Sequence, residues 1–203
     1  MFPLHDDNPA RRPPLVTGTI IGICIAVFIW QSLLGDEQSQ RAVLALGAIP
    51  AVLFDHAELA SDLVWVPTWA TLVTSMFMHG GLWHLLGNLL YLWIFGNNVE
   101  DAMGHVRFVV FYLLCGLVAA LAHAWSDPVS AVPMIGASGA ISGVLGAYLL
   151  LFPHARVLVG LPIAFYIHTL YLPAVWVLGF WFVLQLISAA LAQAEGGGVA
   201  WLA

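Results

Sequence analysis

The sequence predicts an all-α, polytopic helical membrane protein, and three observations favour this fold class. Of the 203 residues, 62% are hydrophobic and 8% are charged, whereas a soluble domain has about 25% charged residues. The mean hydropathy is +0.95. Several stretches also approach the length of about 20 apolar residues that crosses the hydrocarbon layer as a helix. We therefore expect a multi-pass chain in the lipid bilayer.

The chain divides into a tail and one membrane domain. Residues 1–14 contain four prolines among polar residues, and such clusters are typical of irregular structure. We expect them to form a cytoplasmic N-terminal tail, and residues 15–203 to form the membrane domain. The first span is expected at Leu15–Leu34. No clear cleavage site follows it, so we interpret it as a retained anchor, with a cleaved signal peptide as the alternative.

Residues 35–80 are too mixed to span the membrane. Acidic residues alternate there with apolar stretches and with Trp65 and Trp69, which is typical of a segment at the membrane interface. Four further spans are expected at Leu82–Phe95, Phe108–Ala124, Ile135–Phe152 and Leu172–Ala192. A sixth begins at Val199 and is cut off after Ala203, so we expect a bundle of six spans with the sixth truncated, in a C-terminally incomplete fragment.

The arginines predict the orientation. With a cytoplasmic tail, four arginines lie inside and one outside: Arg11, Arg12, Arg107 and Arg156 against Arg41. This distribution satisfies the positive-inside rule. The second and fourth spans then both begin at the outer face, so polar residues in their first turns lie at a similar depth.

A glycine-rich stretch, "GASGAISG" (residues 136–143), carries the first candidate for chemistry, Ser138. The flanking Gly136 and Gly139 permit tight backbone geometry and close approach of a substrate. The free N–H groups of a helix start would face an oxyanion formed there. These surroundings suit a serine nucleophile. The alternative is that the small residues serve only close helix packing.

His84 and Asn88 are the second candidates. Their spacing of four residues puts them on one face of the second span. Polar side chains inside a membrane are costly without a partner, and they mark functional sites by default. Either residue could instead be a satisfied structural donor. Their expected depth, close to that of Ser138, favours a shared site. No metal or cofactor is implied, and nothing indicates nucleic-acid binding.

Three motifs carry a resemblance to a known family: "HGGLWHLLGNLLYLWIFGNNVED" (residues 79–101), "GHVRFVVFYLLCG" (104–116) and "GASGAISGVLGAY" (136–148). With them the sequence resembles the rhomboid intramembrane serine proteases over nearly the whole chain after the tail. The resemblance implies that Ser138 is the nucleophile of a Ser-His dyad. It implies an oxyanion hole formed by His84, Asn88 and the backbone N–H of Ser138, and a structural role for His79. It also implies that Gly143 and Gly146 let the serine helix pack on the last span.

The resemblance further implies an endopeptidase that cleaves transmembrane segments of other membrane proteins near the outer face. We expect a bacterial inner membrane, with the active site opening to the outer side. The general-base histidine is expected directly after "GGGVAWLA" (residues 196–203), and no residue of this chain can be assigned to that role. His123 has a suitable height, but nothing in the sequence aims it at Ser138. We therefore expect the 203-residue chain to be inactive.

Two other functions stay open at this point. A catalytically inactive rhomboid-like protein would bind transmembrane segments without cutting them, although it would have no need for Ser138 and its oxyanion donors. A transporter or channel would carry ionisable residues within several spans. Here almost all Asp, Glu and Arg residues lie in the predicted loops, which disfavours transport. The sequence does not predict the oligomeric state.

Overall fold

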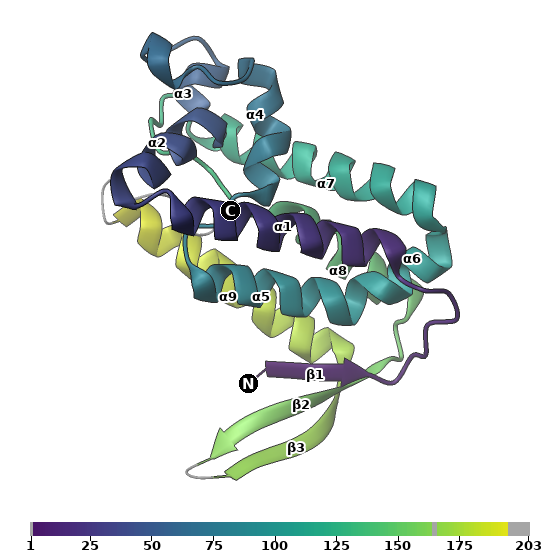
Figure 1. The fold of residues 1–203 in the computed structure, drawn as a ribbon. Coiled ribbons are helices and arrows are strands. Elements are labelled where there is room, and N and C mark those ends of the chain that lie inside the picture. The colour runs from purple at the N-terminus through teal and green to yellow at the C-terminus, as the bar shows by residue number, and fades with distance from the viewer. Residues whose placement is uncertain (1, 164–165, 195–203) are drawn as a thin grey trace.

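The computed structural model describes residues 2–163 and 166–194, and it is mostly helical with one small sheet (Figure 1). The α-helices are α1 (Leu15–Leu33), α2 (Asp36–Leu46), α3 (Pro50–Leu53), α4 (Thr68–Thr74), α5 (Leu82–Tyr91), α6 (Asn97–Met103), α7 (His105–Ser126), α8 (Ser138–Leu151) and α9 (Ala174–Ala194). The strands are β1 (Phe2–Asp6), β2 (Arg156–Ile163) and β3 (Tyr166–Pro173). Single 3₁₀ turns occur at Ser61–Leu63 and Ser75–Phe77.

The predicted second span is longer than expected. A π-helical stretch, Leu92–Gly96, joins α5 to α6 without a break. The helical run therefore continues to Met103 instead of ending at Phe95. It stops where Gly104 takes a positive φ of 81°, a conformation that glycine adopts without steric cost.

Among the described residues, two helices, α1 and α7, are long and apolar enough to cross a membrane by length and composition. Helix α8 and the Ala174–Ile187 part of α9 are shorter apolar helices. The predicted first, third, fourth and fifth spans thus each correspond to a helix, with shifted ends. The arrangement of six spans stays a prediction, because the segment from Val199 lies outside the described residues.

The prediction of an all-helical chain is wrong in one respect, and so is that of a wholly irregular tail. Strand β1, within the predicted tail, pairs antiparallel with β2, and β2 pairs antiparallel with β3. Val157 and Val159 are fully buried, whereas Arg156 and Leu158 are more exposed, as in a strand with one covered face. The pairing partner of β1 lies far along the chain, so no local pattern in residues 1–14 indicates it.

Helix α8 runs through the main hydrophobic core, where Val144, Leu145 and Tyr148 are fully buried. It lies against α7. A Cβ atom on Gly143 would overlap Cys115 Sγ, and one on Gly139 would lie 2.7 Å from Ala119 Cβ. Small residues therefore let these two helices approach closely.

Gly143 faces α7, the third predicted span. A Cβ atom on Gly146 would have nothing within 4 Å among the described residues. The expected packing of Gly143 and Gly146 on the last span stays a prediction, because that span lies outside the described residues.

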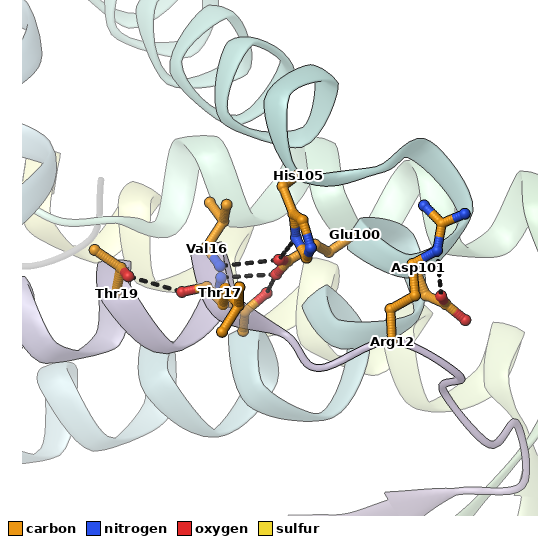
Figure 2. A network of polar contacts seen from close by, with 8 residues as sticks. Arg12, Val16, Thr17, Thr19, Glu100, Asp101 and His105 are labelled. Atoms are coloured by element: carbon orange, nitrogen blue, oxygen red, sulfur yellow. Dashed lines mark hydrogen bonds and ion pairs between the residues drawn. The ribbon is translucent and has the colours of Figure 1, made fainter.

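A buried carboxylate joins three helices at the end of the bundle where α1 begins (Figure 2). Glu100 on α6 is 1% exposed. It accepts hydrogen bonds from the backbone N–H groups of Val16 (2.9 Å) and Thr17 (2.8 Å) at the start of α1. It also accepts bonds from Thr17 Oγ1 (2.7 Å) and from Nδ1 of His105, the first residue of α7 (2.6 Å). Helix α1 has no capping side chain of its own, so Glu100 satisfies its free N–H groups.

Candidate active site

Ser138 is the first residue of α8, in the first turn as predicted, and it is 2% exposed. The chain enters the helix through Gly136, whose φ of 128° favours glycine. The Gly136 N–H donates to the carbonyl of Ser75 (2.9 Å). Backbone bonds of 2.8 and 3.0 Å also join Met134 to Ala48. The segment that leads to Ser138 is therefore fixed to residues 35–80, the predicted interface segment.

A cavity of about 170 Å³ lies at the start of α8. Ser138 lines it, and the Ser138 Oγ atom is buried without a hydrogen-bond partner among the described residues. The other polar lining residues are Ser75, Ser142, His123 and Gln185. A buried hydroxyl without a partner is uncommon in a folded protein, and at a cavity wall it is available to a ligand.

His123 is the residue whose position the sequence reasoning missed. It lines the cavity together with Gly116, Ala119 and Ala120 of the same helix. These four positions follow the i, i+3, i+4, i+7 spacing of one helix face. A stripe of small residues that ends in a histidine was therefore a usable signal in the sequence. Gln185 on α9 was also missed, and no comparable pattern surrounds it.

His84 and Asn88 lie on α5, which contacts α8. Both ring nitrogens of His84 and the Nδ2 atom of Asn88 are buried without a hydrogen-bond partner in the described part of the chain. Neither residue is among those that line the Ser138 cavity. His84 and Asn88 therefore lie on a helix next to the Ser138 helix, and their ring and amide nitrogens have no partner among the described residues. Their common site with Ser138 stays a prediction.

His79 precedes α5 and is 1% exposed. Its backbone N–H donates to Gln31 Oε1 (3.2 Å), and Gln31 Nε2 donates to its carbonyl (3.3 Å). Its Nδ1 donates to the carbonyl of Phe77 (3.3 Å). The ring packs edge to face on His84, with centroids 5.2 Å apart. These contacts hold the turn before α5 and support one side of the His84 ring.

Within residues 2–163 and 166–194, no group of three or more His, Cys, Asp or Glu side chains could hold a metal ion. The chemistry that the described cavity offers is therefore that of a hydroxyl, an imidazole and a carboxamide. Such a set can bind, donate and accept protons, and attack a carbonyl carbon.

Comparison with known proteins identifies the family. The Rhomboid domain matches residues 66–203. The chain belongs to the rhomboid family. It is 34% identical over 136 residues to the rhomboid protease GluP of Bacillus subtilis, an alignment that covers 67% of this chain and 24% of GluP. It is also 34% identical over 152 residues to mitochondrial rhomboid protein 1 of Saccharomyces cerevisiae, covering 72% of this chain and 39% of the yeast protein.

The rhomboid protease GlpG of Klebsiella pneumoniae is 34% identical over 131 residues, which are 64% of this chain and 41% of GlpG. The chain thus spans less than half the length of these relatives. Family membership makes this rhomboid an integral membrane protein. It does not support the expected bacterial inner membrane, because the yeast relative is a mitochondrial protein.

Proposed function

We propose that this rhomboid is an intramembrane serine endopeptidase that cleaves transmembrane segments of other membrane proteins, with Ser138 as the nucleophile. One observation carries the proposal. The Ser138 Oγ atom is buried without a partner at the N-terminus of α8 and on the wall of a cavity. Relatives that carry the name rhomboid protease support the class of reaction.

The chemistry follows from that position. Ser138 Oγ attacks the carbonyl carbon of a substrate peptide bond, and its proton passes to a general base. The carbonyl oxygen becomes an oxyanion at the N-terminus of α8, where the backbone N–H of Ser138 and the helix dipole stabilise it. The C–N bond then breaks, and the base returns the proton to the leaving amine. Water hydrolyses the acyl-enzyme by the same steps.

His84 and Asn88 would supply the remaining oxyanion donors. Their ring and amide nitrogens have no partner among the described residues, so no existing bond has to break before they bind an oxyanion. His79 would position His84 through the contact between their rings. Preorganised donors of this kind contribute most when they need no reorganisation during the reaction.

Two histidines compete for the role of general base. The family resemblance implies one directly after Ala203, in the sixth span. Within the described chain, His123 lines the Ser138 cavity. No hydrogen bond links a described histidine to Ser138 Oγ, so the assignment needs an experiment.

The experiment measures cleavage of a transmembrane substrate in proteoliposomes. Five proteins are compared: the full-length protease, its Ser138→Ala and His123→Ala variants, the chain ending at Ala203, and that shorter chain with His123→Ala. We expect cleavage by the full-length protein and by its His123→Ala variant, and none by the other three. If the chain ending at Ala203 cleaves the substrate, and His123→Ala in that chain abolishes the cleavage, then His123 is the general base. Unchanged cleavage by full-length Ser138→Ala would overturn the proposal.

The sequence leaves one alternative open, an inactive rhomboid-like protein that binds transmembrane segments. It predicts that the full-length protein captures a photo-crosslinkable transmembrane peptide without cutting it, and equally well when Ser138 is replaced by Ala.

We also propose the orientation that the arginines predict. The N-terminus lies in the cytoplasm, and the active site opens to the outer side. The four inward arginines (Arg11, Arg12, Arg107 and Arg156) flank helix ends that lie together at one end of the bundle (Figure 1). We call this the basic end.

A further inference from the structure

The β2–β3 hairpin combines exposure with a lack of charge. From Val157 to Ala194 the sequence holds no Asp, Glu, Lys or Arg, and His168 is the one histidine. This stretch includes most of β2 and all of β3 and α9. A solvent-exposed hairpin is expected to carry charged side chains, because charges on an edge strand suppress its pairing with strands of other molecules. The composition of this hairpin therefore continues that of the apolar helix α9.

The inner face of the hairpin, which carries Val157 and Val159, is buried near the base of the hairpin and exposed farther from it. Near the base, Val157 and Val159 are fully buried in the main core. The strand β3 residues of the same face become more exposed along the hairpin, from Leu170 at 38% to Tyr166 at 75%. The helices thus cover only the base of this face.

The outer face is also apolar. The ring of Phe2 lies over Gly160, whose Cβ position would be 2.9 Å from it. The Tyr171 ring packs edge to face on His5, with centroids 6.0 Å apart. Closer to the turn, Ile167 is 63% exposed. Both faces of the hairpin therefore present uncovered apolar or aromatic side chains near the turn.

The base of the hairpin is fixed at the basic end. Arg156 opens β2, and its backbone pairs with Asp7 beside β1. The Ala174 N–H donates to the carbonyl of Ala155 (2.9 Å), so α9 starts at the base of the hairpin. The hairpin projects from this base beyond the helices (Figure 1). Trp176 and other exposed apolar side chains follow directly on α9.

We propose that the part of the β2–β3 hairpin that carries Tyr166 and Ile167 inserts into the boundary between lipid headgroups and acyl chains at the basic end. Tyrosine and tryptophan favour this depth, since their rings are apolar and their polar atoms remain hydrated. The occupant is lipid because the uncharged surface is continuous with that of α9, in a protein whose family is membrane-embedded.

The depth of insertion is limited by the backbone. Strand β3 lies at the edge of the sheet, so its outward N–H and C=O groups have no strand partner among the described residues. Such an edge is not tolerated in the hydrocarbon interior. The hairpin is therefore a shallow anchor and does not add a span.

The test uses depth-dependent fluorescence quenching in the full-length protein with Cys24 and Cys115 replaced by Ala. A bimane label is attached to Ile167→Cys or, in a second variant, to Tyr166→Cys. The control is His154→Cys, an exposed position between α8 and the hairpin base. The proteins are reconstituted at low density into vesicles of phosphatidylcholine and phosphatidylglycerol. Quenching is measured with nitroxide lipids and with aqueous iodide.

We expect nitroxide at carbon 5 of the acyl chain to quench both hairpin labels at least twofold more than the His154 label, with iodide giving the reverse order. Equal quenching of hairpin and control labels by iodide, without lipid quenching, would overturn the proposal. Ready disulfide formation between copies through Ile167→Cys, with no lipid quenching, would assign this surface to a second copy instead. Neither readout depends on proteolysis, so the result is independent of the proposed function.

Discussion

At the scale of single residues, the unpaired polar atoms were the part of the site that the sequence could indicate. Two local patterns can be recognised without knowledge of packing. Ser138 stands beside glycines, and His84 stands four residues before Asn88. The place of His123 could not be derived in this way. It depends on how closely α8 approaches α7, and that distance is set by Gly139 and Gly143 against Ala119 and Cys115.

The proposed oxyanion role of Asn88 gives a kinetic prediction for the full-length protease. Asn88→Ala removes a donor that acts mainly in the transition state, so kcat should fall about 10²–10³-fold with little change in KM. Steady-state cleavage of a transmembrane substrate measures both constants. Gln38→Ala, which removes an exposed carboxamide on α2, should leave them unchanged. A higher KM at constant kcat would show that Asn88 binds substrate without stabilising the oxyanion.

Gly143 gives a prediction about packing. In Gly143→Ala the new methyl group would overlap Cys115 Sγ and lie 2.6 Å from Cys115 Cβ, so the helices must separate. Overpacking of this kind costs about 1–3 kcal/mol. Adding Cys115→Gly removes both clashing atoms and should restore part of the loss. Thermal unfolding in detergent measures the cycle, and Gly146→Ala is the matched control. Independent, additive effects of the two substitutions would contradict the described contact.

At the scale of elements, the helices were predictable and the sheet was not. Each long helix is encoded by a continuous apolar stretch, and only its ends shifted in the structure. Strand β1 is five residues long, and its partner is more than 150 positions away along the chain. Such a short segment forms a strand because it pairs with β2, and its own sequence does not indicate this pairing. The apolar stretch of β2 and β3 also resembled a loop leading into the fifth span, because period and composition do not separate short strands from other apolar segments.

The Glu100 network makes the start of α1 depend on a residue of α6. In the unmodified protein, the N–H groups of Val16 and Thr17 and the His105 ring donate to the two carboxylate oxygens of Glu100 (Figure 2). In Glu100→Gln an NH₂ group replaces one of these oxygens, so it faces donors without an acceptor. We expect a loss of about 2–4 kcal/mol, since a buried group loses its partners. The melting temperature in detergent measures this loss. Glu37→Gln, at an exposed site on α2, should change it little. A melting temperature unchanged in Glu100→Gln would mean that α1 is held by apolar packing alone.

At the scale of the whole molecule, the N-terminal segment joins the far end of the serine helix. Tyr148 of α8 donates a hydrogen bond to Asp6 Oδ2 (2.5 Å), and Asn8 Nδ2 donates to the Tyr148 hydroxyl (2.8 Å). Asn98 in turn donates to the carbonyl of Asn8 (2.7 Å). The helix that begins at Ser138 is therefore fixed at one end by the predicted interface segment and near its other end by residues 2–8.

This connection should depend on pH through Asp6. Burial raises the pKa of Asp6, and the hydrogen bonds from Tyr148 and Asn8 only partly oppose that effect. The folded protein thus binds the Asp6 proton more tightly than the unfolded chain does. Asp6 therefore favours folding most at low pH, and this contribution is lost as the pH rises from the ordinary aspartate pKa through the raised folded value. In Asp6→Asn, which stays neutral and keeps an acceptor for Tyr148, the loss should disappear. Melting temperatures at a series of pH values from about 4 to 8 should then fall less steeply with rising pH than in the unmodified protein, whereas Asp36→Asn on α2 should keep the original slope. A slope in Asp6→Asn equal to that of the unmodified protein would show that Asp6 ionises without strain and that the N-terminal strand is held by its pairing with β2 alone.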